Sequence, residues 1–217
     1  MPRLAGNLSM LFNEVDFPGR FRAASEAGFT GVEYLFPYDN DKNELADTLQ
    51  RNGLTQVLHN LPAGDFDAGD RGLACLADRV GEFQDSVALA LEYATALGCP
   101  QLNCLAGAPP ASSEPDAVRE TLVSNLRFAA AEMDKRGVRL LIEPLNSRDN
   151  PGFYLTRSAQ ARSIIEEVGA PNLWLQYDIY HMQIMEGDLI TTIEANLDVI
   201  RHIQLADNPG RHEPGTG

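Results

Sequence analysis

The stretch VRLLIEPLN, residues 138–146, has the pattern of a buried β-strand that ends in polar residues. Its apolar run is short, and a carboxylate, Glu143, interrupts it directly before Pro144. A helical pattern precedes the stretch after Pro115, and another follows it over 156–168. Short apolar runs between helices are typical of parallel sheets that helices cover on their faces. The stretch is therefore read as one β-α unit of a repeating fold.

The same strand pattern recurs along the whole chain. Together with residues 138–146, the predicted strands cover 4–10, 30–36, 54–60, 101–107, 172–181 and 202–207. Each is separated from the next by a segment long enough for a crossover helix, which parallel strands require. The sequence therefore predicts seven β-α units in one parallel sheet.

Ordinary boundary signals mark the predicted helices. Pro18 stands near the start of the first helix and Gly28 at its end. Thr156 is expected to cap a helix that closes at Gly169, and Asp188 is expected to cap the last one. The predicted helices cover 17–28, 43–53, 78–97, a segment that begins at Pro115, 156–168 and 189–199.

The number of strands decides between two α/β folds. A doubly wound sheet usually has five or six strands, whereas a (β/α)₈ barrel has eight strands and about 250 residues. This sequence has 217 residues and ends in the glycine-rich GRHEPGTG, residues 210–217. We therefore predict a (β/α)₈ TIM barrel, a single domain over 1–217, and expect its eighth βα unit to be missing at the C-terminal end.

Composition limits the partners. Lysine and arginine total 17 and aspartate and glutamate total 31, for a net charge of −14. This excess repels nucleic acids and anionic membranes, whose phosphates need clustered cations, but it permits a small carboxylate substrate. No stretch approaches the roughly 20 apolar residues of a membrane span. Three cysteines, Cys75, Cys99 and Cys104, show no metal-ligand spacing with histidine and are expected to be reduced and buried, which favours the cytoplasm.

Polar residues lie at the carboxyl ends of the predicted strands, where barrel enzymes carry their chemistry. Glu143, Asp178 and Gln204 lie at corresponding places on three consecutive strands. Adjacent strands are about 4.8 Å apart, so the three oxygen-bearing side chains are expected to converge. Two carboxylates repel each other unless one is protonated or a cation lies between them. An all-oxygen set favours a hard divalent cation such as Mg²⁺ or Mn²⁺.

The structural alternative is that Glu143 and Asp178 cap loops or pair with Arg148 or Arg211. Histidines near strand ends are likewise more often satisfied core residues than ligands. Spacing alone leaves both interpretations open, because the sequence has no short metal motif such as HExxH.

Seven motifs, in order, resemble the hydroxypyruvate isomerase family of the xylose isomerase-like (β/α)₈ barrels. The resemblance runs from about residue 4 to 217, and a sister branch, the 2-oxo-tetronate isomerases, shares nearly all of it. The motifs are NLSMLFNEVDF, VEYLFPYD, LHNLPAGD, GDRGLACL, LIEPLNSRDNPGF, LQYDIYHMQIMEGD and HIQLADNPGRHEPGTG.

The resemblance implies roles for particular residues. Glu143 matches the acid that binds the metal and moves a proton, and Asp178 and Gln204 match further metal ligands. His181, in DIYH, matches a residue that contacts the substrate in related ketose epimerases, which usually have histidine in place of Gln204. The family's second catalytic glutamate lies on the eighth strand, which these 217 residues do not contain.

The implied reaction interconverts hydroxypyruvate and 2-hydroxy-3-oxopropanoate (tartronate semialdehyde) by proton transfer through a metal-stabilised enediolate. The substrate carboxylate needs a cation, for which Arg211 is the first choice and Arg148 the second. His59 and His181 are expected to hydrogen-bond substrate oxygens. The resemblance also implies a homo-oligomer.

Other functions are alternatives to hydroxypyruvate isomerase, and the sequence fits some of them equally well and others less well. A 2-oxo-tetronate isomerase or a ketose 3-epimerase would need almost the same residues. A DNA-repair endonuclease on this fold would need a histidine-rich zinc site and a basic groove, against four histidines and a charge of −14. The alternative outside the enzymes is a non-catalytic binding protein or an inactive fragment. The loop 61–72, rich in glycine and aspartate, is either a lid or an ordinary connection.

Overall fold

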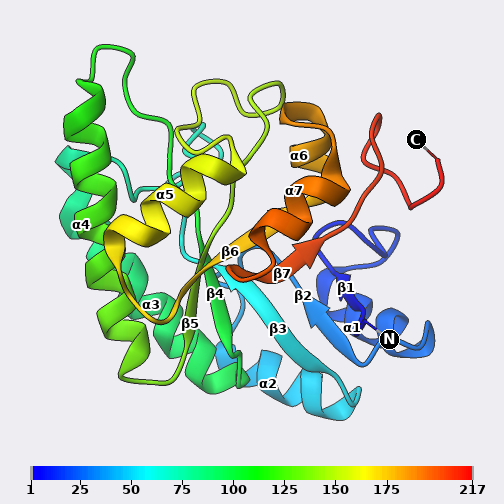
Figure 1. Ribbon diagram of the computed structural model, residues 1–217. Coiled ribbons are helices and arrows are strands. Elements are labelled where there is room, and N and C mark those ends of the chain that lie inside the picture. The colour runs from blue at the N-terminus through cyan, green and yellow to red at the C-terminus, as the bar shows by residue number, and fades with distance from the viewer. Residues whose placement is uncertain (1, 217) are drawn as a thin grey trace.

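A sheet of seven parallel strands forms the centre of the computed structural model, which describes residues 2–216 (Figure 1). The strands follow one another in chain order, and all six neighbouring pairs are parallel. They are β1 Ala5–Asn7, β2 Gly31–Glu33, β3 Thr55–Asn60, β4 Gln101–Cys104, β5 Arg139–Ile142, β6 Leu173–Asp178 and β7 Ile200–Gln204. The sheet curls with helices on its outer side, so the predicted TIM-barrel fold is confirmed, with seven strands present.

The helices connect the strands and cover the outer face of the sheet (Figure 1). A short 3₁₀ segment, η1 Ala77–Arg79, leads into α3. The α-helices are α1 Phe17–Glu26, α2 Lys42–Arg51, α3 Val80–Leu97, α4 Pro115–Asp134, α5 Ser158–Val168, α6 Ile179–Met185 and α7 Leu189–Asn196.

The predicted strand 172–181 is wrong at its end, because β6 stops at Asp178 and α6 begins there. Asp178 is the N-cap of α6, and its Oδ1 accepts from the backbone N–H of Tyr180 at 2.8 Å and of His181 at 3.4 Å. Such a cap satisfies donors that the first helical turn leaves unpaired. The stretch DIYH is therefore a strand-to-helix turn that fixes Asp178 and His181 relative to each other. Asp188 does precede α7, but its side chain caps no described residue of that helix.

The prediction that Thr156 caps α5 is also wrong. The cap comes from Glu186, which lies after α6 and accepts from the backbone N–H of Ser158 at 2.8 Å and from its hydroxyl at 2.9 Å. The helix does end at Gly169, which is left-handed with φ 69°. A carboxylate from a distant segment thus stabilises the start of α5.

Glu186→Ala is expected to lower the free energy of unfolding by about 1 kcal/mol, the usual cost of losing a helix cap. Urea denaturation followed by circular dichroism measures the loss. Glu194→Ala, at an exposed position on α7, is the matched control and is expected to change the unfolding free energy by less than about 0.5 kcal/mol. Equal effects of the two substitutions would show that Glu186 does not act as a cap.

The two faces of the sheet differ in chemistry because alternate strand residues point to opposite sides. On β6, Leu175 and Tyr177 pack into the apolar core against the helices. Gln176 and Asp178 point to the inner face, where Gln176 meets Gln204 of β7. The interior of most TIM barrels is filled with branched apolar side chains, whereas here it is lined by amides and carboxylates.

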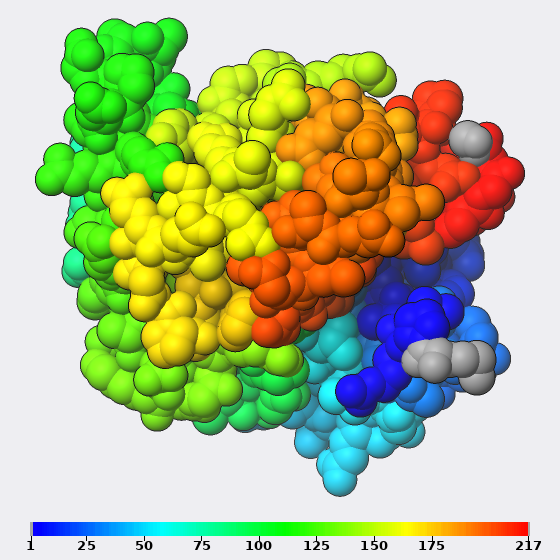
Figure 2. Space-filling model, viewed as in Figure 1, coloured from blue at the N-terminus to red at the C-terminus, as the bar shows by residue number. Residues whose placement is uncertain are grey.

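The segment after β7 extends beyond the carboxyl end of that strand and lies near the N-terminal part of the chain (Figures 1 and 2). It carries Arg211 back to the carboxyl end of β6, where this side chain reaches Asp178. Cys75, Cys99 and Cys104 are all buried with free thiols, as predicted. Within residues 2–216, no helix has both the length and the apolar character needed to cross a membrane.

Candidate active site

Three buried titratable side chains gather at the carboxyl ends of β5 and β6. Glu143 directly follows β5, Asp178 ends β6, and His181 lies in the first turn of α6. One ligand atom from each lies within 4.8 Å of the others. Their exposed fractions are 5%, 2% and 3%. The fold thus brings Glu143 and Asp178 together in one place shielded from solvent.

The Glu143 carboxyl is held by amides. Asn103 of β4 donates from Nδ2 to Oε2 at 2.8 Å, and the Gln176 side chain also hydrogen-bonds to it. Burial, and after it the negative charge of Asp178, together raise the pKa of Glu143 to about 8. A carboxyl with a pKa near neutrality can both accept and release a proton, as a general acid–base requires.

Asp178 combines both structural roles that the sequence left open. Its Oδ1 caps α6, while its Oδ2 accepts from Arg211 Nη2 at 3.2 Å. Arg211 also lies over the Tyr180 ring, 4.9 Å from its centre, and has a left-handed backbone with φ 58°. A non-glycine residue in this conformation is held there by its surroundings. Arg211 therefore brings a positive charge to the pair of buried carboxylates.

Gln204 lies next to Asp178 in the sheet, as the two residues are Cα partners of β6 and β7. Its Oε1 accepts from Gln176 Nε2 at 3.0 Å, and its Nε2 donates to Glu33 Oε1 at 2.6 Å. An amide oxygen has two acceptor positions, so Oε1 keeps one for a further partner. Because the Glu33 carboxylate accepts, the atom of the Gln204 amide that faces it is Nε2, and the other atom is Oε1.

Glu33 is the centre of an inner network that sequence reasoning missed. Its carboxylate accepts from Asn7 Nδ2 at 2.9 Å, from His202 Nε2 at 2.7 Å and from Gln204. The other ring nitrogen of His202 lies 3.3 Å from Gln101 Nε2. Three donors satisfy a carboxylate that is only 5% exposed. The network joins β2 to β7 and holds Gln204 in place.

The structure does not bring His59 to this site. Its neighbour Asn60 points inward and accepts from Asn103, so His59 points outward to the helix layer. There its Nδ1 lies 3.0 Å from Gln56 Nε2, its ring meets Tyr38, and its side chain is 0% exposed. The predicted substrate contact of His59 is corrected accordingly: it is a core histidine, and burial lowers its pKa to about 3.

His59 is expected to weaken the fold in acid. The unfolded chain takes up a proton near the ordinary pKa of 6.5, but the folded chain does so only near 3, so stability falls as the pH drops between these values. The slope contributed is at most about 1.4 kcal/mol per pH unit. Denaturant unfolding at several pH values is expected to show a flatter decline for His59→Gln than for the wild type. His212→Gln, at an exposed position, should keep the wild-type slope; identical slopes for all three proteins would contradict the assignment.

Two other predicted features lie outside the cluster. Arg148 is exposed in the loop after β5. The loop 61–72 is fixed at its base, since Gly72 pairs with Ala106 and Asp70 pairs with Arg79 at 2.7 Å, while its tip at 65–69 is exposed. The loop thus has a fixed base and an exposed tip, where the Phe66 ring meets Phe36 and Arg71.

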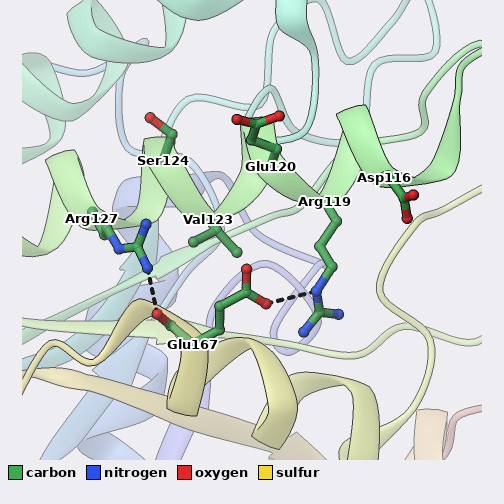
Figure 3. Close-up of a pocket in the computed structure, with 7 residues that line it drawn as sticks. All are labelled: Asp116, Arg119, Glu120, Val123, Ser124, Arg127 and Glu167. Atoms are coloured by element: carbon green, nitrogen blue, oxygen red, sulfur yellow. Dashed lines mark hydrogen bonds and ion pairs between the residues drawn. The ribbon is translucent and has the colours of Figure 1, made fainter.

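A surface hollow of about 450 Å³ lies between α4 and α5, on the outer side of the helix layer (Figure 3). Arg119 pairs with the Glu167 carboxylate at 2.7 Å, and Arg127 donates to the Glu167 carbonyl oxygen at 2.6 Å. These contacts join two helices, and none of the predicted site residues lines the hollow. The acidic cluster at the strand ends is therefore the stronger candidate site.

Buried acids at the carboxyl ends of parallel strands lie where TIM-barrel enzymes carry their active sites. The family model described as xylose isomerase-like TIM barrel matches residues 21–217, and the chain belongs to this family. It is 54% identical to the hydroxypyruvate isomerase of Escherichia coli strain K12 over 217 residues, which are 100% of this chain and 84% of that protein. It is 46% identical to the 2-oxo-tetronate isomerase of Cupriavidus necator, with the same coverage of 100% and 84%.

A solved structure, described as an AP endonuclease of family 2 from Brucella melitensis, superposes with a TM-score of 0.98. It is 46% identical and the match covers 100% of this chain and 84% of that one. The predicted resemblance to the hydroxypyruvate isomerase family is confirmed by these relatives. The chain is an isomerase of the xylose isomerase-like family.

Proposed function

We propose that this enzyme interconverts hydroxypyruvate and 2-hydroxy-3-oxopropanoate. The observation that carries the proposal is the geometry of two buried carboxyl groups, Glu143 and Asp178, which lie side by side at the strand ends. Their burial and proximity raise the pKa of Glu143. The relative with 54% identity, named hydroxypyruvate isomerase, supports this substrate.

The reaction moves one proton between neighbouring carbons. Glu143 takes a proton from the hydroxymethyl carbon of hydroxypyruvate, and the electron pair of that C–H bond forms the carbon–carbon double bond of an enediolate. The proton then returns to the adjacent carbon, and the hydroxyl proton moves from one oxygen to the other, so that the carbonyl changes place. Atoms and electrons balance without an oxidant. General acid–base help of this kind contributes about 10²–10⁴ in rate.

A divalent cation, Mg²⁺ or Mn²⁺, fits the same residues. Glu143, Asp178 and the free acceptor position of Gln204 form an oxygen donor set, and the two buried carboxylates need positive charge beside them. When bound, such a cation supplies Lewis-acid polarisation of the carbonyl and offsets the negative charge of the enediolate. The amide contacts of Glu143 and Gln204 orient both oxygens.

The substrate carboxylate pairs with Arg211, the cation nearest to the buried acids, and His181 contacts a substrate oxygen. Asn103 offers a further contact. Its Oδ1 is buried and has no hydrogen-bond partner among residues 2–216, although its Nδ2 is bound to Glu143. A substrate hydroxyl beside Glu143 satisfies this acceptor, whose isolation is otherwise costly.

Arg211→Gln is expected to raise KM for hydroxypyruvate by about 10–100-fold, since a hydrogen bond to a charged group is worth roughly 1.5–3 kcal/mol. Steady-state kinetics measures the change. Arg148→Gln, which removes an exposed arginine from the neighbouring loop, is the control and is expected to leave KM within twofold, about 0.4 kcal/mol. If Arg148→Gln raised KM more than Arg211→Gln does, Arg148 would be the residue that pairs with the substrate carboxylate.

A 2-oxo-tetronate isomerase is the second candidate, supported by the relative with 46% identity. A ketose 3-epimerase would return the proton to the carbon that lost it, and an inactive protein would return none. Nucleic acid is not a proposed partner, because the net charge of −14 disfavours phosphate backbones.

Product analysis tests these functions together. The purified protein with Mg²⁺ is incubated in deuterated water with hydroxypyruvate, a 2-oxo-tetronate or a ketose, and products are identified by NMR. Conversion of hydroxypyruvate to 2-hydroxy-3-oxopropanoate, with the highest kcat/KM of the three, is expected. A higher kcat/KM for another substrate would reassign the function within the family, and no conversion of any would contradict it.

The proposed setting is the cytoplasm, as the three free thiols suit a reducing compartment. We also propose a homo-oligomer. β1 and β7 are the edge strands of the described sheet. At the β7 edge, Ile203 and Leu205 are 44% and 55% exposed. Exposed edges favour association. Sedimentation equilibrium tests this, and a monomer at all concentrations would contradict it.

A further inference from the structure

The two ring nitrogens of His181 have different partners. Nδ1 receives two hydrogen bonds from Asn146, one from its backbone N–H at 3.2 Å and one from its side-chain Nδ2 at 2.7 Å. A backbone N–H can only donate, so Nδ1 must accept. In a neutral imidazole the other nitrogen then carries the proton. Both residues are almost fully buried, at 0% and 3% exposed.

The Asn146 amide is itself fixed. Its Nδ2 also donates to Asp149 Oδ2 at 3.0 Å, and its Oδ1 accepts from the backbone N–H of Asp149 at 2.8 Å. The same Asp149 oxygen accepts from the Tyr180 hydroxyl at 2.7 Å. These contacts join the loop after β5 to the first turn of α6, and they keep the donor end of Asn146 towards the His181 ring.

We propose that Asn146, oriented by Asp149, is a positioning residue that keeps His181 in the Nε2–H tautomer. Nε2 lies 3.7 Å from Asp178 Oδ2 and 3.5 Å from Arg211 Nη2. Both separations are longer than an ordinary N–H hydrogen bond, so Arg211, which can only donate, does not require Nε2 to be an acceptor. The ring therefore presents a hydrogen-bond donor to the site.

This tautomer decides between two roles for His181. The side chain lies close enough to Glu143 and Asp178 to complete a metal cluster, but a protonated Nε2 has no lone pair for an ion. His181 is thus a donor to a substrate oxygen, and Gln204 supplies the third ligand. This second step rests on the proposed function, whereas the tautomer rests only on the contacts with Asn146.

Nitrogen-15 NMR of histidine-labelled protein tests the tautomer without any assay. The four histidines are assigned by single substitutions, and two-bond proton–nitrogen couplings identify the protonated nitrogen near neutral pH. His181 is expected to show a protonated Nε2 and an unprotonated Nδ1, with or without added Mg²⁺. A protonated Nδ1, or loss of the Nε2 proton on adding Mg²⁺, would overturn the proposal.

Asn146→Asp is the decisive variant, because it keeps the Oδ1 acceptor for Asp149 and replaces the Nδ2 donor with an oxygen. The variant keeps the backbone N–H contact to Nδ1 at 3.2 Å, but its carboxylate can only accept, and a charge-assisted hydrogen bond is stronger than a neutral one. The Nδ1 of His181 is therefore expected to gain a proton. Asn150→Asp adds the same charge to the same loop and is expected to leave the His181 spectrum unchanged. Among the described residues, the hydrogen bond of the Asn150 side chain goes to the Asn146 carbonyl, not to His181. An unchanged spectrum in Asn146→Asp would contradict the role of Asn146, and the wild-type spectrum still tests the tautomer if this variant does not fold.

Kinetics separates this proposal from the proposed function. If the wild type converts hydroxypyruvate, Asn146→Asp is expected to lower kcat while circular dichroism stays unchanged, and Asn146→Ser, which restores a hydroxyl donor, is expected to recover part of it. An inactive wild type with the expected spectrum would refute the function and support the tautomer. An active wild type with a protonated Nδ1 would support the function and refute the tautomer.

Discussion

Glu143→Gln is expected to lower kcat by about 10²–10⁴-fold, the usual contribution of a general acid–base. Glutamine has nearly the same shape and still accepts from Asn103, but an amide cannot take a proton from carbon. Steady-state kinetics with hydroxypyruvate measures the loss. Glu120→Gln, at the surface hollow on α4, is the matched control, and a Glu143→Gln enzyme as active as this control would show that Glu143 is not the base.

The same substitution is expected to change how stability depends on pH. In the folded protein without added metal, burial raises the pKa of Glu143 from 4.5 to about 8. The folded chain then binds the proton more tightly than the unfolded chain, so wild-type stability falls as the pH rises through this interval. Glu143→Gln removes this fall. Urea unfolding at pH values across the interval distinguishes a chemical effect on kcat from a loss of folding.

Asp178→Asn is expected to lower kcat/KM by at least about 10²-fold, because polarisation by a bound divalent cation is worth several kcal/mol in the transition state. The fold is expected to remain, since asparagine is as good an N-cap as aspartate and can still accept from Tyr180 and His181. Activity and unfolding free energy are measured on the same preparation.

Asp178→Ala separates the two roles of this residue. It removes the cap as well as the charge, and is expected to cost about 1 kcal/mol more stability than Asp178→Asn. If Asp178→Asn keeps wild-type activity while Asp178→Ala loses it, the aspartate is only a helix cap. That result would remove Asp178 from the proposed metal site.

The strands were predictable because each apolar run is short and lies between helical patterns, as in VRLLIEPLN. The start of α6 was missed because the LWLQYD run continues into the apolar IYHM without a glycine or proline. Only the three-dimensional position of the Asp178 side chain, which caps two N–H groups, shows that the strand ends there.

The inner network was partly visible in the sequence. Polar residues two apart occur as Gln101 and Asn103, Gln176 and Asp178, and His202 and Gln204. This period of two places each pair on one face of a strand, and it is the signal that sequence reasoning did not use. The same alternation puts His59 on the opposite face from Asn60.

Other contacts had no local signal. Glu33 meets His202 and Gln204 across the inside of the sheet, although these residues lie 169 and 171 positions further along the sequence. Asn146 follows Glu143 by three residues, but its contact with His181 depends on where α6 begins. Such pairings follow from tertiary geometry, and residue type and spacing alone do not fix them.

Titration of Mn²⁺ into the purified protein, followed by calorimetry, tests the shared cation site of Glu143 and Asp178 most directly. We predict one ion per chain, with binding abolished in the Glu143→Gln, Asp178→Asn double variant, weakened in Gln204→Leu, and retained in His181→Asn. Binding that survives the loss of both carboxylates, or no binding by the wild type, would contradict the proposed site.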